Sequence, residues 1–108
     1  MGTGHRFVFI GDPSTNPAAG AALVTTDAVQ RAGTYQVRLF VSSSILPLSV
    51  EFQQRGDGLT KRTQLYHLSK SPFVDDVGRF HALKNATFRV LNRNAVVGEV
   101  TTRITLEP

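Results

Sequence analysis

The fold of this chain is decided by one stretch of sequence, Gly33-Thr-Tyr-Gln-Val-Arg-Leu-Phe-Val-Ser-Ser-Ser-Ile-Leu-Pro-Leu-Ser-Val-Glu-Phe-Gln-Gln54. Apolar side chains occupy every second position in its first half, and a second alternating run follows Pro47. A period of two places alternate side chains on opposite faces, which is typical of a half-buried β-strand. We therefore expect two strands that neighbour each other in one antiparallel sheet. The residues expected in the core are Tyr35, Val37, Leu39, Val41, Val50 and Phe52.

Short strands and turns are expected on both sides of this stretch. The patterns predict strands over residues 5–10, 23–26, 59–68, 87–91 and 96–107, a helical turn over 27–32, a long connection over 69–78, and a short strand or bend over 79–83. The strand at 59–68 follows the tight turn Arg55-Gly-Asp-Gly58 and should pair back onto residues 48–54. At Gly98 we expect a bulge or a close approach of another segment, because this residue has no side chain to pack.

About seven or eight short strands without a crossover helix predict an all-β chain. The expected architecture is a single antiparallel β-sandwich over residues 1–108, either a jelly roll or immunoglobulin-like, with residues 1–4 flexible. A chain of 108 residues fits one domain of this kind.

Composition excludes several classes of protein. No apolar run approaches the ~20 residues of a membrane span, and no apolar segment after a basic one marks a secretory signal. The absence of cysteine excludes disulfides, thiolate catalysis and cysteine-ligated zinc. The net charge is +4, but the basic residues are scattered, and only Lys61 and Arg62 are adjacent. Because no basic stripe alternates with aromatic platforms, we interpret the charge as a solvated surface and expect neither nucleic acid nor a membrane as a partner.

No group of residues has the spacing of a catalytic or metal site. The histidines His5, His67 and His81 are far apart, whereas zinc needs three or more converging ligands. The carboxylates of Asp75 and Asp76 would point in opposite directions on an extended segment. The serines at 42–44 lack the Gly-x-Ser-x-Gly turn of a nucleophile. We therefore expect no enzyme activity, no catalytic residues, no metal and no cofactor.

Two short motifs match known recognition sequences by letter. Arg55-Gly56-Asp57 spells the tripeptide that integrins recognise, and Asn85-Ala86-Thr87 spells a glycosylation sequon. We interpret the first as a turn and assign no role to the second.

The chain has more apolar residues than one face of a small sandwich readily hides. Phe40 and Leu91 each lie on the face opposite the main apolar set of their strand. The surplus fits either a two-layer core with imperfect alternation or a surface buried against another subunit. The candidate contact regions are residues 6–10 and 72–83. The candidate interface residues within them are Phe7, Phe9, Phe73, Val74, Arg79 and Phe80.

A resemblance to a known class of protein is carried by two segments, Ala32-Gly-Thr-Tyr-Gln-Val-Arg-Leu-Phe-Val41 and Arg89-Val-Leu-Asn-Arg-Asn-Ala-Val-Val-Gly-Glu-Val-Thr-Thr-Arg-Ile-Thr-Leu106. A basic, cysteine-free, all-β chain of this size resembles the small cement or decoration proteins of tailed-bacteriophage capsids. The resemblance is one of type and size, without a diagnostic motif, so it assigns no site residue. It implies a virion protein that binds and stabilises the outer capsid surface, as a homo-oligomer and often as a trimer. The alternatives are a carbohydrate- or protein-binding β-sandwich module, or another phage tail or head-completion protein.

Overall fold

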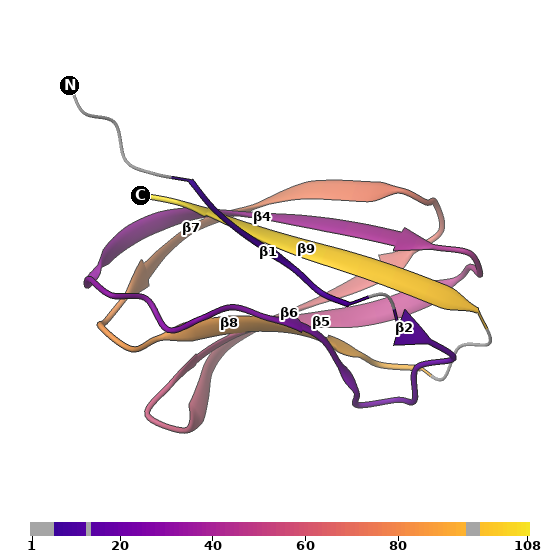
Figure 1. Ribbon diagram of the computed structural model, residues 1–108, viewed down its shortest axis with the longest axis horizontal. Helices are drawn as coiled ribbons and strands as arrows, with labels where there is room; N and C mark the ends of the chain where they lie inside the picture. Colours follow the sequence, from indigo (N-terminus) through magenta and orange to yellow (C-terminus); the bar gives the residue numbers. More distant parts are fainter. Residues whose placement is uncertain (1–5, 13, 95–97) are drawn as a thin grey trace.

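Nine strands and no helix are present in the computed structural model within residues 6–12, 14–94 and 98–108, the part of the chain that it describes. They form two antiparallel sheets that pack face to face (Figure 1). Sheet A has the order β1-β9-β4-β7, with β2 also paired to β9, and sheet B has the order β3-β8-β5-β6. The strands are β1 (Phe7–Ile10), β2 (Ser14–Thr15), β3 (Ala22–Thr25), β4 (Gly33–Ser43), β5 (Leu48–Gly56), β6 (Leu59–Leu68), β7 (Phe73–Ala82), β8 (Thr87–Asn92) and β9 (Glu99–Glu107).

The strand pairs are nested along the chain. The innermost pair is β5 with β6, and around it lie β4 with β7, β3 with β8, and β1 with β9. This long double ribbon is rolled up so that β9 also pairs with β4 and β8 also pairs with β5. Such connectivity is that of a jelly roll. The prediction of an antiparallel β-sandwich is therefore confirmed, and the jelly roll is the member of the predicted pair that the topology matches.

The prediction that residues 33–54 form two neighbouring strands is wrong. β4 lies in sheet A and β5 lies in sheet B, so the residues between them cross from one sheet to the other. Both strands alternate because each covers the same core from its own sheet. The core residues expected on them are all buried, with exposed fractions between 0% and 7%. These residues are Tyr35, Val37, Leu39, Val41, Val50 and Phe52.

Two further predictions are corrected by tertiary contacts. Residues 69–78 are not a long connection, because β7 begins at Phe73 and pairs with β4 along its length. An extra residue at Val77, where the register shifts between Val37 and Arg38, reverses the alternation and conceals the strand in the sequence. Residues 27–32 form no helical turn, because the backbone N–H and C=O of Val29 bond to residues 85–86 instead.

Other predicted elements are confirmed with adjusted ends. β6 pairs back onto β5 as expected, and β8 and β9 replace the predicted strands at 87–91 and 96–107. The predicted flexible residues 1–4, His5 and positions 96–97 lie outside the described residues. The expected close approach at Gly98 is confirmed, since a Cβ there would lie 2.6 Å from Ser44 Oγ and from Ile45 Cγ1.

Three phenylalanines from both sheets form the centre of the core. The ring centroids of Phe52 and Phe80 are 5.5 Å apart, those of Phe52 and Phe88 are 5.8 Å apart, and those of Phe80 and Phe88 are 6.0 Å apart. Burial of each such side chain contributes about 1.5–3 kcal/mol to folding. With the interior filled in this way, function is to be sought on the outer faces and at the ends of the sandwich.

Candidate protein interface on the outer face of sheet A

The alternation of each strand in sheet A sends one set of side chains into the core and the other outward. Residues directly opposite each other on paired strands share a face, so the register aligns the outward set into rows. One row crosses all four main strands of the sheet and consists of Val74, Phe40, Arg103 and Ile10. The next row consists of Asp76, Arg38, Thr105 and Val8. We define the A-face patch as Val8, Ile10, Arg38, Phe40, Val74 and Arg103.

The A-face patch leaves large apolar side chains in contact with water. Val8, Ile10 and Val74 are 47%, 68% and 66% exposed, and Phe40 is half-buried. A groove of about 330 Å³ is lined by Val8, Phe40 and Val74 and by the two arginines of the patch. Exposed apolar side chains grouped with charged ones are typical of a site that contacts another molecule.

The charges on this face are only partly compensated. Arg6 forms an ion pair with Glu107 at 3.5 Å, and Asp76 accepts a hydrogen bond from Gln36. By contrast, Arg38 and Arg103 are exposed and form no ion pair with any residue that the structure describes. The patch therefore combines apolar surface with uncompensated positive charge, and arginine is enriched at protein interfaces.

One arginine of the patch is held in place by an aromatic ring. The guanidinium carbon of Arg103 lies 4.5 Å from the ring centroid of Phe40, which is the geometry of a cation–π contact. This contact restricts the side chain without consuming its hydrogen-bond donors, so Arg103 remains able to bind a carboxylate.

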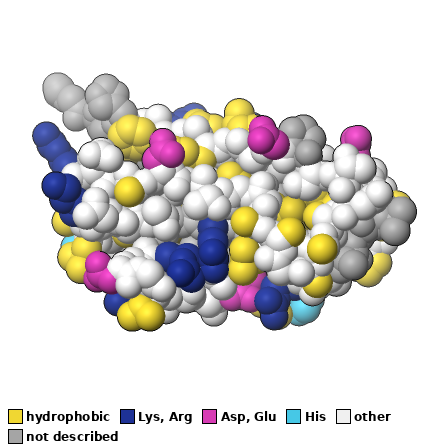
Figure 2. All heavy atoms as spheres, turned by 60° about the horizontal axis from the view of Figure 1, so that its bottom comes forward, with side chains coloured by type: hydrophobic (Ala, Val, Ile, Leu, Met, Phe, Trp, Pro, Cys, Tyr) yellow, Lys and Arg dark blue, Asp and Glu magenta, His cyan; other side chains and the backbone are white. Residues whose placement is uncertain are grey.

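The outer face of sheet B has a different character. Arg89 Nε donates to Gln53 Oε1 at 2.7 Å, and Gln53 Nε2 donates to Glu51 Oε2 at 2.7 Å. Glu51 also pairs with Arg93 at 3.3 Å, so these four polar side chains satisfy one another. Figure 2, which brings this side forward, shows basic and acidic side chains interspersed with hydrophobic ones.

One further polar contact on sheet B has chemical interest. Ser49 Oγ and His67 Nδ1 lie 2.9 Å apart, across the pairing of β5 and β6. No hydrogen bond among the described residues joins His67 to a carboxylate that would orient it, as the acid of a catalytic triad does. Residues 6–12, 14–94 and 98–108 contain no cluster of three or more histidine and carboxylate side chains that could hold a metal ion. The same residues contain no helix that could cross a membrane.

The residues predicted from the sequence as interface candidates lie in different environments in the structure. Val74 and Arg79 lie on the outer face of sheet A, as expected of contact residues. Phe80 is only 4% exposed and belongs to the core, so its nomination as an interface residue is wrong. Phe73 packs against Tyr66, with ring centroids 5.4 Å apart. Phe7 and Phe9 point to the inner side of β1.

Sequence reasoning missed most of the A-face patch. Val8 and Ile10 lie within the candidate contact region 6–10 but were not named individually. Arg38 and Arg103 were not nominated, although each lies on the exposed side of an alternating strand. The available signal was the out-of-phase position of Phe40 and the apolar residues on both faces of residues 7–10. It could not reveal that four strands bring these side chains into shared rows.

Comparisons with known proteins add no family to this description: no protein-family model matches the chain, and no curated protein is significantly similar to it.

Proposed function

We propose that this protein is a structural virion component that docks on a phage capsid shell through the A-face patch and stabilises the shell as a decoration or cement protein. The observation that carries the proposal is the exposed row of Val74, Phe40, Arg103 and Ile10 across sheet A. The resemblance in type and size to small decoration proteins supports the shell as the partner. The jelly roll is also used by viral capsid domains, which supports the proposal by analogy of fold alone.

The chemistry of the patch selects the kind of surface that it docks on. Two copies facing each other through this patch would bring Arg38 and Arg103 close to the same residues of the other copy, and like charges oppose such pairing. A shell surface that carries carboxylates next to apolar areas would complement both features. A homo-oligomer, such as a trimer, would therefore form through other surfaces and leave the patch free for the shell.

Stabilisation would follow from repetition of a modest contact. A protein interface of standard size buries ~1,600 Å², and the same contact recurs over a shell. If the protein is an oligomer, several patches engage the shell at once, and the effective concentration of the second and third contacts is high. No single contact then needs to be strong.

The apolar part of the patch provides the direct test. Val74→Asp and Ile10→Asp each place a charge at one end of the exposed row, on the edge strands β7 and β1. Loss of an interface side chain that carries much of the binding energy weakens binding at least about tenfold. The matched control is Leu65→Asp, because Leu65 is 53% exposed but lies on the outer face of sheet B. Co-sedimentation with shells prepared without this protein should show lost attachment for the first two variants alone. Equal attachment by all three would contradict the proposal.

A carbohydrate-binding module is the second candidate, and one observation favours it. Phe7 is 46% exposed and is the most exposed aromatic side chain of the chain. Stacking on a sugar ring needs such a platform. Binding of the isolated protein to a glycan array, abolished by Phe7→Ala, would support this function, whereas attachment to shells that survives Phe7→Ala would support docking through the patch.

A further inference from the structure

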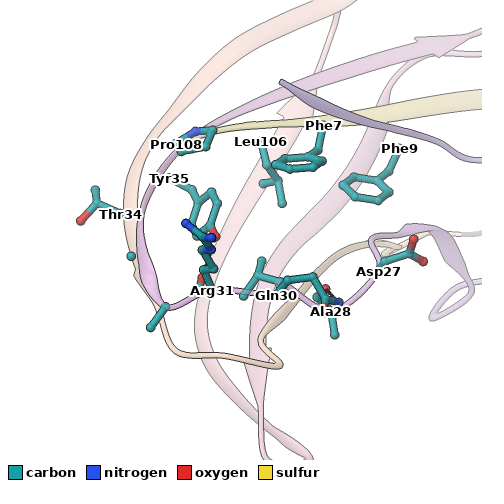
Figure 3. Close-up of a pocket in the computed structure, with 13 residues that line it drawn as sticks. Phe7, Phe9, Asp27, Ala28, Gln30, Arg31, Thr34, Tyr35, Leu106 and Pro108 are labelled. Atoms are coloured by element: carbon teal, nitrogen blue, oxygen red, sulfur yellow. Dashed lines mark hydrogen bonds between the residues drawn. The ribbon is translucent and has the colours of Figure 1, made fainter. Parts of the chain in front are cut away.

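A second hollow lies at the end of the sandwich, on the inner side of β1. Figure 3 shows Phe7 and Phe9 pointing from β1 into it, with Leu106 of β9 and Tyr35 of β4 beside them. Residues 27–32, which connect sheet B to sheet A, form its floor. The cavity has a volume of about 750 Å³, within the ~300–1,000 Å³ of small-molecule sites.

The walls of this end cavity are mainly apolar and well supported. Tyr35 and Leu106 are buried, and Phe9 packs against the core. The Tyr35 hydroxyl donates to the backbone oxygen of Arg31 at 2.6 Å, which ties β4 to the segment that forms the floor. Val29 is fixed from below by backbone hydrogen bonds to residues 85–86. The cavity is therefore held open by the fold and presents surface for an apolar ligand.

Charge at the rim is unevenly distributed. Arg31 lines the cavity at the end where Tyr35 and Pro108 lie, and Asp27 lies at the opposite end, beyond Phe9 (Figure 3). Arg31 is exposed and forms no ion pair with the described residues. An anionic group is thus favoured at one end of the cavity and disfavoured at the other.

We propose that the end cavity binds a small amphipathic carboxylic acid, with its apolar body between Phe7, Phe9 and Leu106 and its carboxylate at Arg31. The guanidinium can donate two parallel hydrogen bonds to a carboxylate, which an alcohol of the same length cannot accept. This site is separate from the A-face patch, because Phe7 and Phe9 point to the opposite side of β1 from Val8 and Ile10. It would exist whether or not the protein docks on a shell.

Two ligands that differ only in the head group test the proposal. Titration calorimetry with decanoate should give a Kd on the order of 10 µM, the affinity that burial of most of a ten-carbon chain supplies. Decan-1-ol should bind about tenfold more weakly, because it lacks the bidentate contact. Arg31→Gln should weaken decanoate binding about tenfold and leave decan-1-ol unchanged. The matched control is Lys70→Gln, which removes one positive charge in the loop between β6 and β7 and should change neither affinity.

A variant that fills the cavity tests whether both ligands bind inside it, independently of the arginine at its rim. Ala28 lines the cavity and is partly exposed, so Ala28→Phe should block both ligands while the thermal unfolding curve stays cooperative. Failure of both ligands to bind the wild-type protein would overturn the site. If binding were equal in the wild-type and Arg31→Gln proteins, the assignment of the carboxylate to Arg31 would be overturned.

Discussion

The outer faces of the two sheets differ in what their side chains do for one another. On sheet B, Arg89, Gln53, Glu51 and Arg93 form a continuous chain of polar contacts. On sheet A, the rows of the A-face patch place exposed aliphatic side chains beside arginines that pair with none of the described residues. A face whose polar groups are satisfied gains little from being covered, whereas burial of apolar surface and pairing of free charges both favour association. This difference is the reason for which we propose sheet A as the side that a partner contacts.

The proposed difference between the two faces requires that the A-face patch does not stabilise the fold as a core side chain does. Phe88→Ala, in the aromatic centre shared by both sheets, should lower the free energy of unfolding by about 3–5 kcal/mol, because it leaves a cavity. Phe40→Ala, on the outer face of sheet A, should lower it by less than about 1 kcal/mol, since the lost cation–π contact is exposed. Urea unfolding of the two variants measures both values. A cost for Phe40→Ala close to that of Phe88→Ala would show that the patch supports the fold.

Charge reversal tests whether the two outer faces differ in their contribution to attachment. The double variant Arg38→Glu/Arg103→Glu should weaken attachment to shells at least about tenfold, because it opposes the acidic surface proposed as the partner. Arg89→Glu changes the sign of a charge on sheet B and should leave attachment intact. Attachment of the wild-type protein should also weaken between low and high salt, since exposed charges are screened. If charge reversal on sheet B weakened attachment as much as charge reversal on sheet A, the outer face of sheet A would not be the specific docking face.

The smallest expected effect on stability comes from a hydrogen bond that joins the two sheets and lies on neither outer face. Tyr66 on β6 donates a hydrogen bond to Asp75 Oδ2 on β7 at 3.0 Å. Burial, this hydrogen bond and the carboxylate charge raise the pKa of Tyr66 far above its usual value of about 10. The folded protein therefore holds the phenolic proton more tightly than the unfolded chain. This contribution to stability is complete below about pH 10 and is lost as the pH rises toward the folded pKa.

Tyr66→Phe tests this bond. The variant should lower the free energy of unfolding by about 0.5–1 kcal/mol at pH 7, a modest loss because the pair is partly exposed. The difference from the wild type should shrink above pH 10 in urea unfolding series, and attachment to shells should not change. If the difference in unfolding free energy between the wild type and Tyr66→Phe grew with pH, the pKa of Tyr66 would be lowered by folding and not raised.

Sequence reasoning identified strands wherever alternation was uninterrupted. β4, β5, β6, β8 and β9 were all expected near their observed bounds. The alternation of apolar residues predicts which side chains of a strand are buried, but it does not predict which sheet the strand joins. The assignment of β4 and β5 to one sheet was wrong for this reason. The bulge at Val77 concealed β7, and the hydrogen bonds of Val29 to a distant segment replaced the helical turn predicted over 27–32. Sheet assignment, the bulge and these hydrogen bonds all depend on contacts between residues that are far apart in the sequence.

The candidate interface was less accessible to sequence reasoning than the fold. Val74 and Arg79 were nominated from an apolar surplus in their region, and Phe80 was nominated for the same reason although it fills the core. Phe40 was noted as out of phase but was not connected to Val74, Arg103 and Ile10. Their alignment depends on the register of three separate strand pairs, which composition and periodicity do not determine.

The contact proposed between the outer face of sheet A and the shell can be observed directly. A cryo-electron microscopy map of shells carrying this protein tests it most directly, because two sheets of a sandwich with different strand orders can be told apart in density. We expect β1, β9, β4 and β7 to face the shell, with acidic side chains of the shell opposite Arg38 and Arg103. A map in which the outer face of sheet B, or the edge formed by β6 and β7, faces the shell would show that sheet A is not the docking face.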